Sequence, residues 1–142
     1  MASFTKVNKF VENAVHDMDL ASDQLKVALS NTAPGSESTN PTGDSGGVLA
    51  NITEISYSNC SSRDLTTSSS SQTSGTYKLV LADLTLTASG TVGPFRYIYL
   101  YDDTVSGDPL IGLYDYGTSL TLNSGDTFTL DFSASNGVLQ LA

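Results

Sequence analysis

The N-terminal end of the chain carries its one helical pattern. Apolar residues recur at steps of three and four, at Phe4, Val7, Val11, Ala14 or Val15, and Met18. This spacing predicts an amphipathic helix over 4–18, with Ser3 as a candidate N-cap. A helix this short is marginal alone, so its apolar face must dock either on the chain's own sheet or on a neighbouring subunit. We expect residues 1–20 to form an N-terminal helical arm.

From residue 24 onward the hydrophobic period changes to two residues. Leu25, Val27 and Leu29 alternate with less apolar neighbours, which predicts a half-buried strand. A shorter strand is expected within 48–57.

Two stretches are almost devoid of large apolar residues. They cover 34–47, which is dense in glycine and small polar residues, and 58–75, which contains four consecutive serines. Such segments bury too little apolar surface to offset the entropy lost on ordering. We expect both to be flexible polar loops, and we expect no long hairpin to project from the sheet.

The strongest pattern covers residues 76–142. Leu79 and Leu81 share one parity and Leu84 and Leu86 the other, which predicts a β-bulge or a change of sheet at 82–83. Alternating apolar residues predict further strands over 95–101, 110–116, 120–122, 128–132 and 139–141. Glycine-containing hairpin signals follow at 123–126 and 135–137.

These patterns predict an all-β fold. We expect an antiparallel β-sandwich or jelly roll of about seven to nine short strands with one short N-terminal helix. The β-sandwich should be a single domain over 21–142, with the helical arm before it.

Charge and composition exclude several partners. The chain has 142 residues and a net charge of −9, and residues 79–142 hold Arg96 alone against seven acidic residues. Without a basic stripe, neither nucleic acid nor an anionic membrane is an expected partner. No apolar run approaches the roughly 20 residues of a membrane span, and no secretory signal is evident. Cys60 is the one cysteine, which suits a reducing cytoplasm.

One pentapeptide imitates a catalytic motif. Residues 43–47 spell GDSGG, the nucleophile sequence of chymotrypsin-like serine proteases. The one histidine, His16, lies only 29 residues before Ser45, on the predicted helix. That spacing leaves no room for the barrels that assemble such a triad, so we expect no catalytic residues.

The acidic turn at 102–109 is the one candidate for a cation. Asp102, Asp103 and Asp108 flank a glycine and could offer oxygen ligands to calcium, although they do not match EF-hand spacing. An ordinary solvated turn is the favoured interpretation. A lone histidine and a lone cysteine far apart do not make a zinc site, so we expect neither a metal nor a cofactor.

The tyrosines offer the best functional hint. Tyr97, Tyr99 and Tyr101 share one face of a predicted strand with Phe95, and that face is either a second core layer or an aromatic contact surface. The residues we predict for a protein interface are Phe4, Val7, Phe10, Val11, Tyr97, Tyr99 and Tyr101.

Several runs of the chain resemble a family of small virion structural proteins of tailed bacteriophages. They are LKVALSNTAP (25–34), ANITEI (50–55), GPFRYIYLY (93–101), PLIGLYDYG (109–117) and the ending over 127–141. The resemblance implies a capsid decoration (cement) protein that binds the major capsid protein on the outer surface of the virion. It also implies synthesis in the cytoplasm of the bacterial host. Oligomers with closed symmetry are the default, and decoration proteins are often trimers, so the resemblance implies a homotrimer.

Two other functions stay open. A tail-tube or head–tail completion protein of the same particle is one alternative, although a tail-tube protein usually carries a long hairpin. A carbohydrate-binding β-sandwich is the other, with Tyr114 and Tyr116 as its sugar platform. The mass of the assembly in solution separates trimer, hexameric ring and monomer.

Overall fold

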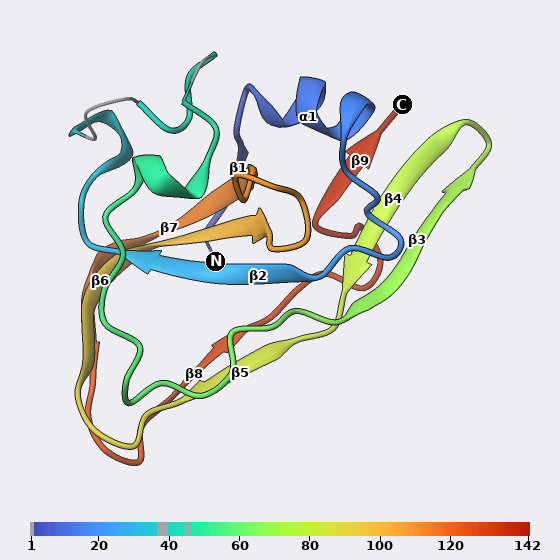
Figure 1. Cartoon of the computed structure of the whole chain (residues 1–142). Coiled ribbons are helices and arrows are strands. Elements are labelled where there is room, and N and C mark those ends of the chain that lie inside the picture. The colour runs from blue at the N-terminus through green and yellow to red at the C-terminus, as the bar shows by residue number, and fades with distance from the viewer. Residues whose placement is uncertain (1, 37–39, 45) are drawn as a thin grey trace.

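The computed structural model describes residues 2–36, 40–44 and 46–142, and the fold is antiparallel and mostly β, as predicted (Figure 1). These described residues form nine strands in open sheets. In chain order the elements are β1 (Phe4–Lys6), α1 (Phe10–His16), β2 (Leu25–Ser30), β3 (Thr67–Thr73), β4 (Thr76–Leu81), β5 (Leu84–Thr87), β6 (Val92–Asp102), β7 (Leu110–Leu122), β8 (Thr127–Leu130) and β9 (Leu139–Leu141).

A four-stranded sheet in the order β1-β7-β6-β2 forms the centre of the molecule. Figure 1 shows α1 on one side of this sheet and β5 and β8 on the other. The central strand β6 is therefore buried along most of its length, with Tyr97, Tyr99 and Tyr101 exposed by 7%, 0% and 3%. Of the two interpretations of this tyrosine row, the structure supports the core layer.

The free edge of β2 is covered by the chain between residues 54 and 65. The backbone N–H groups of Val27, Leu65 and Ile55 make hydrogen bonds of 2.9–3.0 Å that tie this segment to β2. The Arg63 guanidinium also donates to the carbonyl of Val27 and lies 3.6 Å from the centroid of the Tyr57 ring. Because these bonds satisfy the backbone of β2, its edge is closed to further pairing.

Two smaller sheets, β3-β4-β9 and β5-β8, share one continuous stretch of chain. Strand β4 ends at Leu81 and β5 begins at Leu84 in the other sheet, so the parity change at 82–83 is a change of sheet. The Asp83 carboxylate accepts a 2.8 Å hydrogen bond from the N–H of Phe132 at the same level. The two turns over 123–126 and 135–137 likewise connect strands of different sheets, so they do not form the hairpins we predicted.

The N-terminal segment differs from its prediction. Residues Phe4–Lys6 form a strand that pairs with β7, and the helix is confined to Phe10–His16, with Lys9 in place of Ser3 at its N-cap. The reason lies across the sheet, at Gly112. The Phe4 ring occupies the space that a side chain at position 112 would need, so β1 can lie close against β7. The segment therefore packs on the chain's own sheet rather than extending as an arm.

The stretch over 58–75 also differs from its prediction, because it contains an ordered strand. Thr67–Thr73 pairs with β4 along its length, and Ser74 and Gly75 form the turn with φ of 51° and 82°. Backbone pairing with an apolar strand compensates for the lack of apolar side chains in β3. The resulting β3–β4 hairpin projects from the body (Figure 1), so the expectation of no projecting hairpin was wrong.

Two other segments complete the comparison with the predicted elements. The expected strand within 48–57 is instead a 3-10 turn at Leu49–Asn51 and isolated bridges such as Ser30 with Glu54. In the polar stretch 34–47, Pro34–Ser36 forms another 3-10 turn, whereas residues 37–39 and 45 lie outside the described part of the chain.

Candidate functional site

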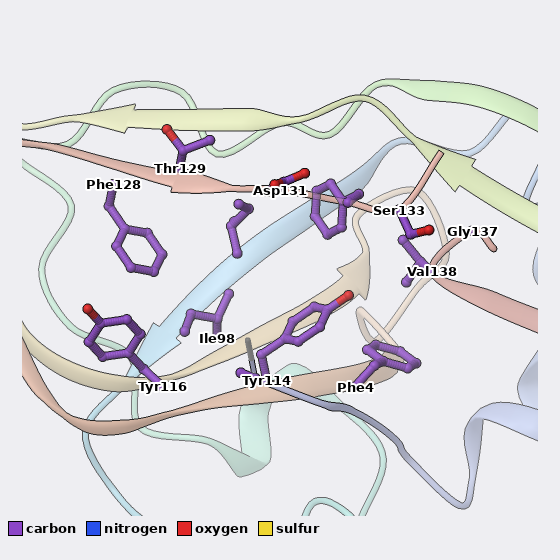
Figure 2. A pocket seen from close by; sticks show the side chains of 13 residues that line it. Phe4, Ile98, Tyr114, Tyr116, Phe128, Thr129, Asp131, Ser133, Gly137 and Val138 are labelled. Atoms are coloured by element: carbon purple, nitrogen blue, oxygen red, sulfur yellow. The ribbon is translucent and has the colours of Figure 1, made fainter. Parts of the chain in front are cut away.

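An apolar groove opens between the four-stranded sheet and β8 (Figure 2). Its cavity volume is about 360 Å³, within the range of roughly 300–1,000 Å³ typical of ligand pockets. Most of the groove lining is aliphatic or aromatic, and the lining comes from β1, β6, β7, β8 and the segment that follows β8.

One wall is a row of side chains that crosses three strands. The register pairs Phe4 of β1 with Tyr114 of β7, and Tyr114 with Ile98 of β6. Directly paired residues point to the same face of a sheet, so these three side chains form a continuous surface. Tyr116 lies two residues further along β7 and extends the wall (Figure 2).

The opposite wall comes from β8 and the residues after it. Phe128, Leu130 and Phe132 alternate along the chain and all line the groove. Strand β8 pairs with β5 on one side, and no strand in the described part of the chain pairs with its other edge. This wall therefore combines apolar side chains with unpaired backbone.

The rings gather in two clusters, one at each end of the groove. The Tyr114 centroid lies 5.3 Å from that of Phe4 and 6.3 Å from that of Phe132. At the other end, the Phe128 centroid lies 5.6 Å from that of Tyr116. Figure 2 shows Ile98 between the two clusters, so the groove has aromatic ends and an aliphatic middle.

A charged contact lies on the other side of β7, next to Tyr116. The Arg96 guanidinium donates hydrogen bonds of 2.7 and 3.0 Å to the Asp115 carboxylate, which also accepts a 2.8 Å bond from the N–H of Gly117. The Arg96 contact lowers the pKa of Asp115. Gly117 has φ of +94°, where β7 bulges against β6. Tyr116 has the same parity as Tyr114 in β7, so its side chain faces the groove (Figure 2), and the residue is 46% exposed.

The charge at the groove is negative. Of the described residues in the lining, Asp131 alone is charged, and it is exposed beside Thr129 and Ser133. No salt bridge in the described part of the chain includes Asp131. Burial raises the pKa of Tyr114, which keeps its phenol neutral. The arrangement favours apolar or cationic groups and disfavours anionic ones.

The structure separates the predicted interface residues into three groups. Phe4 lines the groove, and Val11 is 45% exposed on the outer face of α1. The other five are core residues of this chain and offer little or no surface to a partner, which corrects the prediction for Val7, Phe10, Tyr97, Tyr99 and Tyr101. The physical reason is that β6 is covered on both faces of the sheet, so its three tyrosines are core. Val7 and Phe10 are core because α1 and the residues before it pack on the same sheet.

The acidic turn uses its carboxylates internally. Asp102 is fully buried, and its Oδ1 accepts hydrogen bonds of 2.9 and 3.2 Å from the N–H groups of Thr104 and Val105. Asp103 forms a salt bridge with Lys26. The described residues contain no cluster of three or more metal-ligating side chains. Burial and the neighbouring Asp23 carboxylate raise the pKa of Asp102 to about 6.

The protease-like pentapeptide is described only in part, because Ser45 lies outside the described residues. Asp44 accepts a 3.0 Å hydrogen bond from the amide of Asn8. The His16 side chain is 62% exposed, with a nitrogen 4.0 Å from a carboxylate oxygen of Glu12. The histidine thus faces an acid of its own helix.

Sequence reasoning missed most of the groove. Phe128, Leu130 and Phe132 were recognised as an alternating strand face, and such a face is normally core. What the sequence does not reveal is that the layers leave a gap beside these residues. Of the groove tyrosines, Tyr114 and Tyr116 had been singled out, as a possible sugar platform.

No protein-family model, curated protein or solved structure matches this chain. In the described part of the chain, no helix is long and apolar enough to cross a membrane. The groove therefore has to be interpreted from its own geometry.

Proposed function

We propose that this chain is a non-enzymatic structural component of a tailed-phage particle, and that it decorates the outer surface of the capsid. The observation that carries the proposal is the aromatic groove, an accessible apolar surface on a body whose other apolar side chains are mostly packed inside. Aromatic side chains in a partly desolvated pocket are typical anchors of protein interfaces. That the particle is a tailed phage is inferred from the runs of sequence that resemble phage virion proteins.

A decoration protein needs a rigid body and a contact surface repeated in many copies. Weak single contacts then add up through avidity, because copies held on one lattice or in one oligomer bind together. A homotrimer that binds the major capsid protein suits this scheme. The net charge of −9 suits an outer location, away from packaged DNA.

Imaging of the parent particle by electron cryomicroscopy tests the proposal. We expect density that fits this chain at symmetry-related positions on the outer capsid surface. Density on the tail, or a particle without this chain, would overturn it. Purified chain added to particles stripped of it provides the matching binding assay.

A tail component of the same particle is the second candidate, and the β3–β4 hairpin favours it. Tail-tube subunits usually extend such a hairpin to a neighbour, and β3 offers an outer edge that pairs with no other strand in the described part of the chain. Mass measurement in solution distinguishes the two candidates. A trimer supports decoration, and a hexameric ring supports the tail.

A further inference from the structure

We infer that the groove receives an extended segment of a partner protein, which adds as a strand to the free edge of β8. Alternate apolar side chains of this segment enter the groove between the aromatic clusters, and a lysine or arginine of the segment lies beside Asp131. The inference rests on the proposed function for one point, that the partner is another subunit of the particle.

The layers of the fold differ in width at this point. The central sheet has four strands, whereas the sheet that faces its groove side has two, β5 and β8. Part of the row from Phe4 to Tyr116 is therefore left uncovered. A third strand beside β8 would widen the smaller sheet and cover this row. Strand addition at a free edge is an established mode of peptide recognition, in which backbone hydrogen bonds provide much of the affinity.

The dimensions favour a strand over a helix. Packed sheets lie about 10 Å apart, so a strand added beside β8 fits in the existing layer. A helix with its side chains is about 10–12 Å in diameter, so it is wider than the space beside a single strand. Phe128 and Phe132 are four residues apart, which is about 13 Å along an extended chain. A segment of about five residues covers this length and directs two or three side chains into the groove.

Charge restricts the occupant further. Among the residues that the structure describes, the lining contains Asp131 and no lysine, arginine or histidine, so a cationic side chain is attracted and an anionic one is repelled. Asp131 has the opposite parity to Leu130 and Phe132, so its side chain belongs to the outer face of this wall. A basic residue between two inward apolar residues of an added strand would meet it there, as an opposite-charge pair across neighbouring strands.

The test uses the full chain and capped pentapeptides of known sequence. The probe is threonine-phenylalanine-lysine-valine-threonine, whose phenylalanine and valine share one face when extended. In NMR titrations we expect shifts at Ile98, Tyr114 and Leu130. The β8 amide protons that do not bond to β5 should become protected from exchange. The second readout is specific for strand addition, because side-chain docking alone leaves these protons exposed.

Two matched peptides separate the backbone contribution from the charge. Methylation of the backbone nitrogens on the bonding edge should weaken binding about tenfold or more, since each lost hydrogen bond to a desolvated partner is costly. Glutamate in place of lysine should weaken binding severalfold. In D131N the lysine and glutamate peptides should bind alike. D17N, which removes an exposed acid outside the groove, should keep the lysine preference.

Several outcomes would overturn the inference. The methylated peptide could bind as well as its parent, or the glutamate peptide as well as the lysine peptide. A neutral glucose hexasaccharide could shift the groove signals while the peptides do not, which would make Tyr114 and Tyr116 a sugar platform. Absence of any shift at millimolar peptide would also end it.

Failure of the inference is distinguishable from failure of the proposed function. If Y116A loses the peptide but still binds stripped particles, the groove is not the docking site and decoration stands. If the wild-type chain binds the peptide but is not found on the capsid, decoration fails and the groove assignment stands.

Discussion

Two flanks of the molecule differ in whether the chain covers its own strand edge. At the β2 flank, a segment of the chain itself bonds to the strand edge, and the Arg63 guanidinium packs over the Tyr57 ring. At the groove flank, one edge of β8 pairs with no strand among the described residues, and aromatic side chains remain partly exposed beside it. The segment between residues 54 and 65 thus covers the edge of β2, and no comparable segment of the described chain covers the edge of β8. This contrast is why we place the contact surface at the groove.

The largest effect is expected from damage to the covered flank. Leu29 of β2 is completely buried, so L29A removes apolar contacts and leaves a cavity. We expect a loss of about 3 kcal/mol in the free energy of unfolding, measured by urea denaturation. Peptide binding should remain intact under conditions where the variant is folded. A loss below about 1 kcal/mol would show that this flank is not part of the cooperative core.

The next effect comes from the buried carboxyl at the end of β6, on the same flank. The pKa of Asp102 is about 6 in the folded chain, above the ordinary value of 3.8. The folded state therefore binds the proton more tightly than the unfolded state, and this group makes stability fall as pH rises from about 4 through about 6. At pH 7 the cost of the buried charge is fully present.

D102N should remove that cost and keep the bonds to Thr104 and Val105, because the amide oxygen also accepts hydrogen bonds. We expect a gain of about 2 kcal/mol at pH 7 and much less at pH 4, measured by urea denaturation at both values. D103N, which alters an exposed salt bridge nearby, is the matched control. An equal gain at both pH values would contradict the explanation by charge.

The smallest effect on stability is expected in the groove. Tyr116 is 46% exposed, so Y116A should change the free energy of unfolding by less than about 1 kcal/mol. The same change should weaken binding of the pentapeptide and of stripped particles. Y57A on the covered flank is the matched tyrosine variant and should have the opposite profile, with lower stability and unchanged binding. If Y116A is the more destabilising of the two, the groove is a structural layer and not a contact surface.

Much of the fold could be predicted from the sequence, because alternation of apolar residues is a direct record of burial. The change of sheet at 82–83 was visible as a change of parity, and the strand over 95–101 as an apolar run. The helix was placed too early, since Phe4 and Val7 fit the helical spacing as well as a short strand followed by a turn. Only pairing with β7 across Gly112 decides between them.

Other features could not be predicted for a different reason. The serines of β3 carry no strand signal, and they are ordered because β4 supplies a partner. The groove exists because no strand of the described chain lies beside β8. A single sequence shows which residues are apolar, but it does not show which strand edges stay unpaired. The sequence alone therefore gives no reason to separate Phe132 from an ordinary core residue until the arrangement of the layers is known.

The change of sheet at 82–83 has a mechanical consequence. Strands β4 and β5 on one side, and β8 and β9 on the other, form one long ribbon with a joint in the middle, and the joint is clasped where Asp83 accepts the N–H of Phe132. The β3–β4 hairpin belongs to the β4–β9 half of this ribbon. Phe132 lies at the junction of the two halves and lines the groove. A displacement of the hairpin would therefore act on this groove wall through the backbone at 82–83 and through the hydrogen bond between Asp83 and Phe132.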